Sequence, residues 1–159
     1  VRHATCQRVE ALGLKNDYLA FSVRRGDKHS LEHFDYATSE QYVQRAERVV
    51  LGFFEGKQPK IFVATDDCSV MIEFRELRPR WTFVSMCDDP KYHTDGGFHL
   101  SSASQWTEEE SDLHFEKFFT ELFAMTFAKH LIGVKYTNVS WFVYFMRRAH
   151  IHRFELLET

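Results

Sequence analysis

The stretch YLAFSVRRGDK, residues 18–28, begins as an apolar run and ends in a dense cluster of charges. A short, nearly continuous apolar run is typical of a strand that is buried on both faces. A second run of this kind, residues 61–65, follows a helical pattern that opens at Thr38 and extends to about Gly56. Thr38 and Gln41 have the spacing of a capping box, which supports a helix start at this point. The first part of the chain is therefore predicted to alternate strand, helix and strand.

The alternation continues along the rest of the chain. The further elements are expected in this order: a helix at 66–77, a strand at 81–86, a helix at 112–131, a strand at 132–134 and a helix from about 138. A polar loop, residues 87–111, is longer than most connections in compact domains. This order predicts an α/β, Rossmann-like fold with a parallel sheet and helices on both faces, as a single domain over residues 1–159.

Composition limits the classes of function. The net charge is −3, so no overall basic field attracts the chain to nucleic acid or to an anionic membrane, and any anion site must be local. The three cysteines, Cys6, Cys68 and Cys87, lack CxxC spacing, and neither a disulfide framework nor a structural zinc site is predicted. The chain begins at Val1 rather than methionine and is interpreted as a fragment of a larger protein.

Ligands of parallel sheets bind beyond the carboxyl ends of the strands, which directs attention to the charges after the first strand. The guanidinium groups of Arg24 and Arg25 could hold a phosphate or carboxylate there, or could pair with Asp27 and Glu32 in a solvated loop. Lys28 lies near Glu32, so the two could do acid and base work or form a surface ion pair. The tripeptide of residues 25–27 is also the RGD adhesion motif, but nothing indicates an exposed hairpin tip.

Three further groups of residues have both a structural and a functional interpretation. Asp66 and Asp67 most simply cap a helix, and carboxylates at this place also bind nucleotides. The loop at 87–99 contains metal-ligand types without a recognised spacing, so no metal is predicted. Lys117 and Glu121 are expected to pair on the solvent-exposed face of the helix at 112–131. The expected core face of that helix consists of Phe115, Phe118, Phe119, Leu122, Phe123, Met125 and Phe127.

Taken together, four motifs resemble the donor-binding half of the α-1,6-fucosyltransferases and, more distantly, the protein O-fucosyltransferases. The motifs are SVRRGDK at 22–28, Glu32, ATDD at 64–67 and YTNV at 136–139. The resemblance implies half of a GT-B-like enzyme that uses GDP-fucose as donor, a glycan or glycoprotein as acceptor, and no metal or other cofactor. It also implies a further, N-terminal half of the catalytic region and a type II membrane enzyme of the Golgi lumen.

The resemblance further implies roles for individual residues. Arg24, Arg25 and Asp27 belong to the diphosphate-binding motif, Arg25 stabilising the departing GDP. Lys28 and Glu32 match a proton relay that activates the acceptor hydroxyl. The remaining matches to donor-binding positions are Asp66 and Asp67 near the nucleotide, Glu121 in place of an aspartate that reads guanine, and Tyr136, Thr137 and Asn138 at the diphosphate. Ser22 stands where the family has a histidine that contacts guanine, and Trp141 where an arginine is common.

Overall fold

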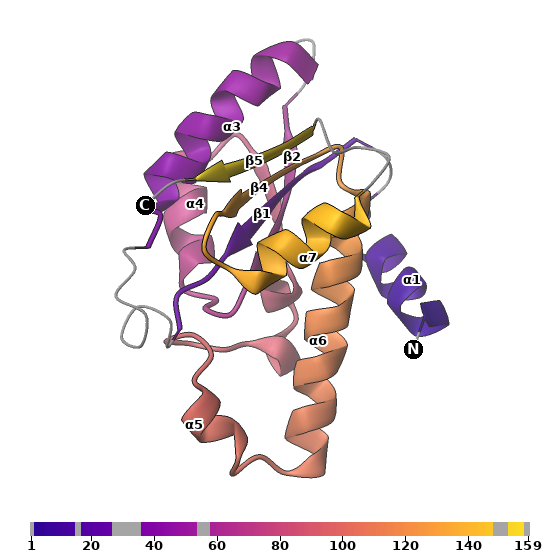
Figure 1. Ribbon diagram of the computed structural model, residues 1–159. Coiled ribbons are helices and arrows are strands. Elements are labelled where there is room, and N and C mark those ends of the chain that lie inside the picture. Colours follow the sequence, from indigo (N-terminus) through magenta and orange to yellow (C-terminus); the bar gives the residue numbers. More distant parts are fainter. Residues whose placement is uncertain (1, 15–16, 27–35, 54–57, 148–152, 158–159) are drawn as a thin grey trace.

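The computed structural model describes residues 2–14, 17–26, 36–53, 58–147 and 153–157. Its centre is a sheet of five parallel strands in the order β3-β2-β1-β4-β5 (Figure 1). The strands are β1 (Leu19–Val23), β2 (Lys60–Thr65), β3 (Thr82–Val84), β4 (His130–Val134) and β5 (Phe154–Leu157). The strand β1 lies at the centre. The chain places β2 and then β3 on one side of it, and β4 and then β5 on the other side. The order therefore changes direction between β1 and β4, as in Rossmann-like folds.

Helices cover both faces of this sheet, as predicted. One face carries α3 (Ser39–Phe53) and α4 (Val70–Leu77), and the other carries α1 (Arg2–Ala11), α6 (Glu108–Phe127) and α7 (Asn138–Met146) (Figure 1). The side chains of β1 alternate between the two cores, because successive strand residues point to opposite faces. Leu19 and Phe21 pack toward α3 and α4, whereas Ala20 packs toward α6.

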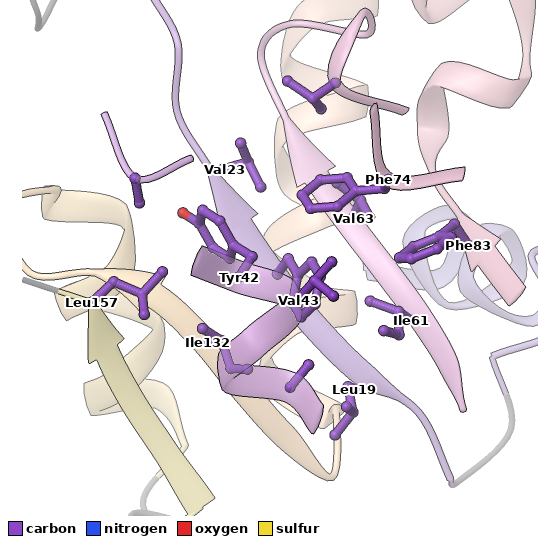
Figure 2. Packing of buried hydrophobic residues seen from close by; sticks show 14 of the residues in the cluster. Leu19, Val23, Tyr42, Val43, Ile61, Val63, Phe74, Phe83, Ile132 and Leu157 are labelled. Atoms are coloured by element: carbon purple, nitrogen blue, oxygen red, sulfur yellow. The ribbon is translucent and has the colours of Figure 1, made fainter. Parts of the chain in front are cut away.

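The core under α3 and α4 is rich in aromatic rings. Tyr42 and Phe74 lie against the sheet residues of β1, β2 and β3 (Figure 2). The ring centroids of Phe21 and Tyr42 are 5.3 Å apart, as are those of Phe21 and Phe74. The hydroxyl of Tyr42 donates a hydrogen bond of 2.6 Å to the carbonyl oxygen of Ser22. This contact fixes the end of β1, from which the predicted site begins.

The start of α3 confirms the predicted capping box. The Gln41 side chain accepts from the Thr38 amide at 2.7 Å, and the Thr38 hydroxyl accepts from the Gln41 amide at 3.3 Å. The region predicted as a loop, residues 87–111, includes most or all of three short helices: η1 (Met86–Asp88), η2 (Pro90–Tyr92) and α5 (Leu100–Ala103). The helix α6 then begins four residues earlier than predicted, at a capping box between Thr107 and Glu110.

The structure corrects the predicted orientation of α6. Its buried residues include Lys117, Glu121 and Met125, whereas Phe115 and Phe119 are about half exposed. Residues 117, 121 and 125 follow one another at helical spacing and form the stripe that faces the sheet, and Phe115 and Phe119 lie on another side of the helix. The prediction that Lys117 and Glu121 pair on the solvent-exposed face was wrong, since both are buried.

The cysteine spacing predicted no disulfide framework and left the pairing of the cysteines open, and the structure contains one disulfide. Cys68 and Cys87 form a disulfide, with their Cα atoms 5.5 Å apart. Cys68 follows β2 and Cys87 follows β3, and these strands are hydrogen-bonded neighbours in the sheet. Two segments that leave adjacent parallel strands at the same edge come within disulfide distance. Spacing along the chain does not reveal this proximity.

No helix among the described residues is both long and apolar enough to cross a membrane.

Candidate functional site

A cavity of about 500 Å³ opens at the carboxyl edge of the sheet, where the strand order changes direction between β1 and β4. Five segments line it: the ends of β1 and β2, the loop at 94–106, the buried stripe of α6, and the start of α7. From the predicted site it contains Arg24, Asp66, Glu121, Thr137 and Asn138. The fold thus brings together residues that are more than 100 positions apart in the sequence.

Arg24 contributes a guanidinium group to the lining of this cavity. Its Nη1 atom lies 3.0 Å from Oδ2 of Asp66, and its guanidinium carbon lies 5.0 Å from the ring centre of Phe98. The side chain is one-quarter exposed, so it is held on one side and open to the cavity on the other. An arginine placed in this way can bind a phosphate group without first losing the freedom of a surface side chain.

Arg25 extends in a different direction and is not among the residues that line the cavity. Its Nη2 atom lies 3.4 Å from the Ser39 hydroxyl and 3.7 Å from Oε2 of Glu73. The Tyr36 ring lies under its guanidinium carbon at 5.5 Å. The two adjacent arginines therefore lie on separate sides of the end of β1, and only Arg24 reaches the cavity in this conformation.

Asp66 connects the segments around the cavity. Its carboxylate accepts hydrogen bonds from the backbone amides of Arg25 at 2.9 Å, of Gly26 at 3.0 Å and of Phe98 at 3.0 Å, in addition to its ion pair with Arg24. The segments that follow β1 and η2 are thereby tied to the end of β2. Asp66 is a positioning residue for Arg24 in this arrangement.

Two glycines allow these segments to approach so closely. A Cβ atom on Gly26 would lie 2.1 Å from the carbonyl oxygen of Phe98, and one on Gly97 would lie 2.4 Å from Cα of Gly26. Gly97 also has a φ of +79°, in the region that side chains disfavour. Glycine at both positions is therefore required for the contact between the two segments.

Glu121 and Lys117 are both more than nine-tenths buried at the wall of the cavity. The amide of Thr65 donates to Oε1 of Glu121 at 3.4 Å. Burial raises the pKa of Glu121 to about 8, while the charge of Lys117 and the Thr65 amide lower it and Asp66 raises it. The Nζ atom of Lys117 lies 3.1 Å from the Thr94 hydroxyl and within 3.9 Å of both sulfurs of the disulfide.

The start of α7 forms another wall. Thr137 caps the helix, since its hydroxyl accepts from the Ser140 amide at 3.2 Å. The amino end of a helix carries a partial positive charge and favours anions. Thr137 and Asn138 line the cavity, whereas the predicted Tyr136 does not and is 39% exposed.

The other predicted residues lie away from the cavity or outside the described part of the chain. Asp67 accepts hydrogen bonds from the Ser69 amide at 3.0 Å and the Ser69 hydroxyl at 2.7 Å, so it stabilises the turn before α4. Asp27, Lys28 and Glu32 lie outside the described residues, and their proposed roles stay predictions. Within the described residues no group of three His, Cys, Asp or Glu could hold a metal ion.

One wall of the cavity is aromatic and was not predicted from the sequence. Its members, Phe98, Trp106, His114 and Phe118, come from the long loop and the first turns of α6. The rings of Trp106 and His114 are 4.6 Å apart, and those of Phe98 and His114 are 5.2 Å apart. Burial, together with the charges of Lys117 and Arg24, lowers the pKa of His114, so this ring is favoured in its neutral form. The available signal was helical spacing, because His114 and Phe118 are four residues apart in the helix predicted at 112–131 and therefore share one face of it.

Comparison with known proteins shows that the fold of this chain is similar to that of solved structures. No protein-family model and no curated protein sequence matches the chain significantly. The crystal structure of POFUT1 in complex with GDP matches with a TM-score of 0.60 and 16% sequence identity. The chain has a fucosyltransferase-like fold. The match covers 97% of this chain and 45% of the POFUT1 chain, so the chain spans about half the length of that structure.

Proposed function

We propose that this chain is the nucleotide-sugar-binding half of an inverting fucosyltransferase that uses GDP-fucose without a metal ion. The observation that carries the proposal is the cavity at the strand-order reversal, where Arg24, the start of α7 and the buried Glu121 converge. Such cavities bind nucleotides in open α/β sheets. The fold match to a structure that contains GDP supports the choice of nucleotide.

The cavity offers separate groups for the two parts of GDP. Arg24 and the amino end of α7 are suited to the diphosphate, since both favour negative charge. Glu121 is suited to the base, because its carboxyl group, once ionised, accepts hydrogen bonds from the N–H groups of guanine. In this proposal Asp66 holds Arg24 in place and does not itself contact the nucleotide.

The reaction is a displacement at the anomeric carbon of fucose. The acceptor hydroxyl oxygen forms the new bond while the bond to the phosphate oxygen breaks, and its electron pair leaves with GDP. Fixed cations stabilise the anionic leaving group, which is the role proposed for Arg24 and Arg25. The proton of the acceptor passes to a carboxylate, for which the family resemblance proposes Glu32 with Lys28.

The acceptor is proposed to be the core GlcNAc of an N-glycan, joined in α-1,6 linkage, by an enzyme of the Golgi lumen that includes a second catalytic half. This assignment rests on the motif at 22–28 with two adjacent arginines, followed by a lysine. A protein O-fucosyltransferase is the second candidate, favoured by the structural match to POFUT1. Assaying the full-length protein with an N-glycan and with a folded protein domain as acceptors separates the two.

Calorimetric titration of the folded chain with GDP, GDP-fucose and UDP tests donor binding. We expect GDP and GDP-fucose to bind and UDP to bind far more weakly. A folded sample that binds neither guanine nucleotide, or that binds UDP equally well, would overturn the proposal.

A further inference from the structure

Lys117 is a buried cation at the cavity wall whose function neither the sequence motifs nor the fold explains. The residue is 6% exposed, and its neighbour Glu121, one helical turn later, is 7% exposed. Both line the same cavity. Burying a charged group costs free energy of folding unless the group is paired or hydrogen-bonded. Two ionisable groups buried at one cavity therefore need a physical explanation.

These two side chains do not form a hydrogen bond or ion pair with one another. The polar contacts of Lys117 are the Thr94 hydroxyl and the two disulfide sulfurs, and within the described part of the chain no carboxylate lies at ion-pairing distance from Nζ. Glu121 accepts one long hydrogen bond, from the amide of Thr65. Lys117 therefore has one good acceptor for its three N–H donors, because sulfur accepts weakly, and Glu121 has further lone pairs that can accept hydrogen bonds.

Their spacing is that of neighbours on one helix face. Residues four apart on a helix have Cβ atoms about 5–6 Å apart, so their polar ends can contact adjacent atoms along one edge of a flat ligand. Phe118 also lines the cavity and stacks against His114, with an interplanar angle of 6°. An aromatic wall beside a donor and an acceptor suits a planar heterocycle with a polar edge.

We infer that Lys117 is a specificity-determining residue that donates to O6 of guanine while Glu121 accepts from the neighbouring N–H groups of the same edge. This inference rests on the proposed function and adds a base-reading residue to it. Guanine presents an acceptor at position 6 and donors beside it. Adenine presents an amino donor at that position, which would face the ammonium group of Lys117.

A phosphate-binding role for Lys117 is the main alternative. Arg24 and the amino end of α7 already provide positive charge for a diphosphate. Lys117 is also buried, whereas Arg24 is only partly buried. The two roles differ in an observable way, because a phosphate contact affects all nucleoside diphosphates equally and a base contact does not.

Lys117→Met removes the donor and retains much of the side-chain volume. We expect calorimetry to show about a tenfold or larger loss of affinity for GDP and also for IDP, which keeps O6, with at most a twofold change for ADP. Lys91→Met, at an exposed lysine of η2, is the control and should leave all three affinities unchanged. An equal loss for GDP and ADP, or no loss for GDP, overturns the inference.

A second measurement needs no variant and covers the case in which Lys117→Met does not fold. The wild-type chain is titrated with GDP and with 6-thio-GDP, in which a weakly accepting sulfur replaces O6. We expect about tenfold weaker binding of the thio compound, and equal affinities overturn the inference. If the wild-type chain binds GDP but shows neither effect, only the role of Lys117 fails. If it does not bind GDP, the proposed function fails as well.

Discussion

Arg24 and Arg25 are neighbours in the sequence, yet their side chains meet different partners. Arg24 contacts Asp66 at the cavity, and Arg25 contacts Ser39 and Glu73 beyond it. The resemblance proposes that both arginines act on the diphosphate. From their placement we expect a division between two roles. Arg24 binds the diphosphate of the bound donor, and Arg25 stabilises the departing GDP after a change of side-chain conformation.

This division makes a prediction for two alanine variants. A charge-assisted hydrogen bond contributes about 1.5–3 kcal/mol, so we expect Arg24→Ala to weaken GDP binding by roughly ten- to a hundredfold. Arg25→Ala should change GDP affinity by less than threefold but abolish transfer in the full-length enzyme. Calorimetry and a transfer assay measure the two effects. Equal losses of GDP affinity in both variants would contradict the division.

Glu121 provides a pH-dependent prediction. Its pKa is raised to about 8 by burial, and the charged groups that affect it are Lys117 on its own helix and Asp66 at the end of β2. Below that pH the carboxyl is mostly neutral and accepts poorly from guanine. GDP affinity should therefore rise as the pH increases from 6 to 8.5, beyond any change seen with ADP, which carries the same diphosphate.

The matched control for this prediction is Glu121→Gln, which cannot ionise. The difference between GDP and ADP should then be independent of pH. A wild-type GDP affinity that parallels ADP across this range, or a variant with the same pH profile as the wild type, would show that Glu121 does not read the base.

At the scale of elements, the segments around the cavity depend on Asp66. Three backbone amides donate to its carboxylate, and each donor left without a partner costs about 1–3 kcal/mol when buried. We expect Asp66→Ala to lower the free energy of unfolding by about 2–4 kcal/mol and to weaken GDP binding. Denaturant unfolding and calorimetry measure these effects.

The adjacent Asp67 is the natural comparison, because it serves only the turn before α4. Asp67→Ala should cost about 1 kcal/mol, as the loss of a helix-cap interaction does, and leave GDP affinity unchanged. If the two alanine variants behaved alike, Asp66 would not be the residue that ties these segments together.

A helix or strand could be predicted where the sequence pattern that indicates it lies in neighbouring residues. The strands β1 and β2 and the start of α3 were predicted, because apolar runs and the Thr38 capping box are read from neighbouring residues. The helix α1 and the strand β5 were missed. For α6, counting apolar residues favoured the phenylalanines as the core face. The structure instead turns Lys117 and Glu121 inward, where they line a cavity rather than the apolar core.

Part of the candidate site could be predicted from the sheet topology, and Glu121 on α6 was predicted from the family resemblance alone. Arg24, Asp66 and Thr137 follow parallel strands, and residues that follow such strands meet at one edge of the sheet. The direction of Arg25 depends on Ser39 and Glu73, which belong to helices on the other face. Partners of this kind come from tertiary packing and have no signal in the order of the residues.

At the scale of the whole molecule, the disulfide that stabilises the fold also supports one wall of the cavity. It joins the segment after β2 to the segment after β3, and Cys68 also holds Thr94, whose carbonyl oxygen accepts from the Cys68 amide at 2.7 Å. Thr94 in turn donates to the carbonyl oxygen of Asp66 at 2.9 Å and contacts Lys117. The geometry of the cavity wall therefore depends on a covalent bond at the edge of the sheet.

Replacing both bonded cysteines by serine tests this connection. Closing a loop of 19 residues stabilises a fold by about 3 kcal/mol, so the double variant should melt roughly 10 °C lower than the wild type. GDP affinity should fall as well, since the segment at Cys68 that hydrogen-bonds to Thr94 is then no longer joined to the segment at Cys87. Cys6→Ser, at the free cysteine, should change neither quantity, and a reductant should lower the melting temperature of the wild type but not of the double variant. Equal melting temperatures of wild type and double variant in oxidising buffer would mean that the sheet and the Asp66 contacts hold the cavity wall without the disulfide.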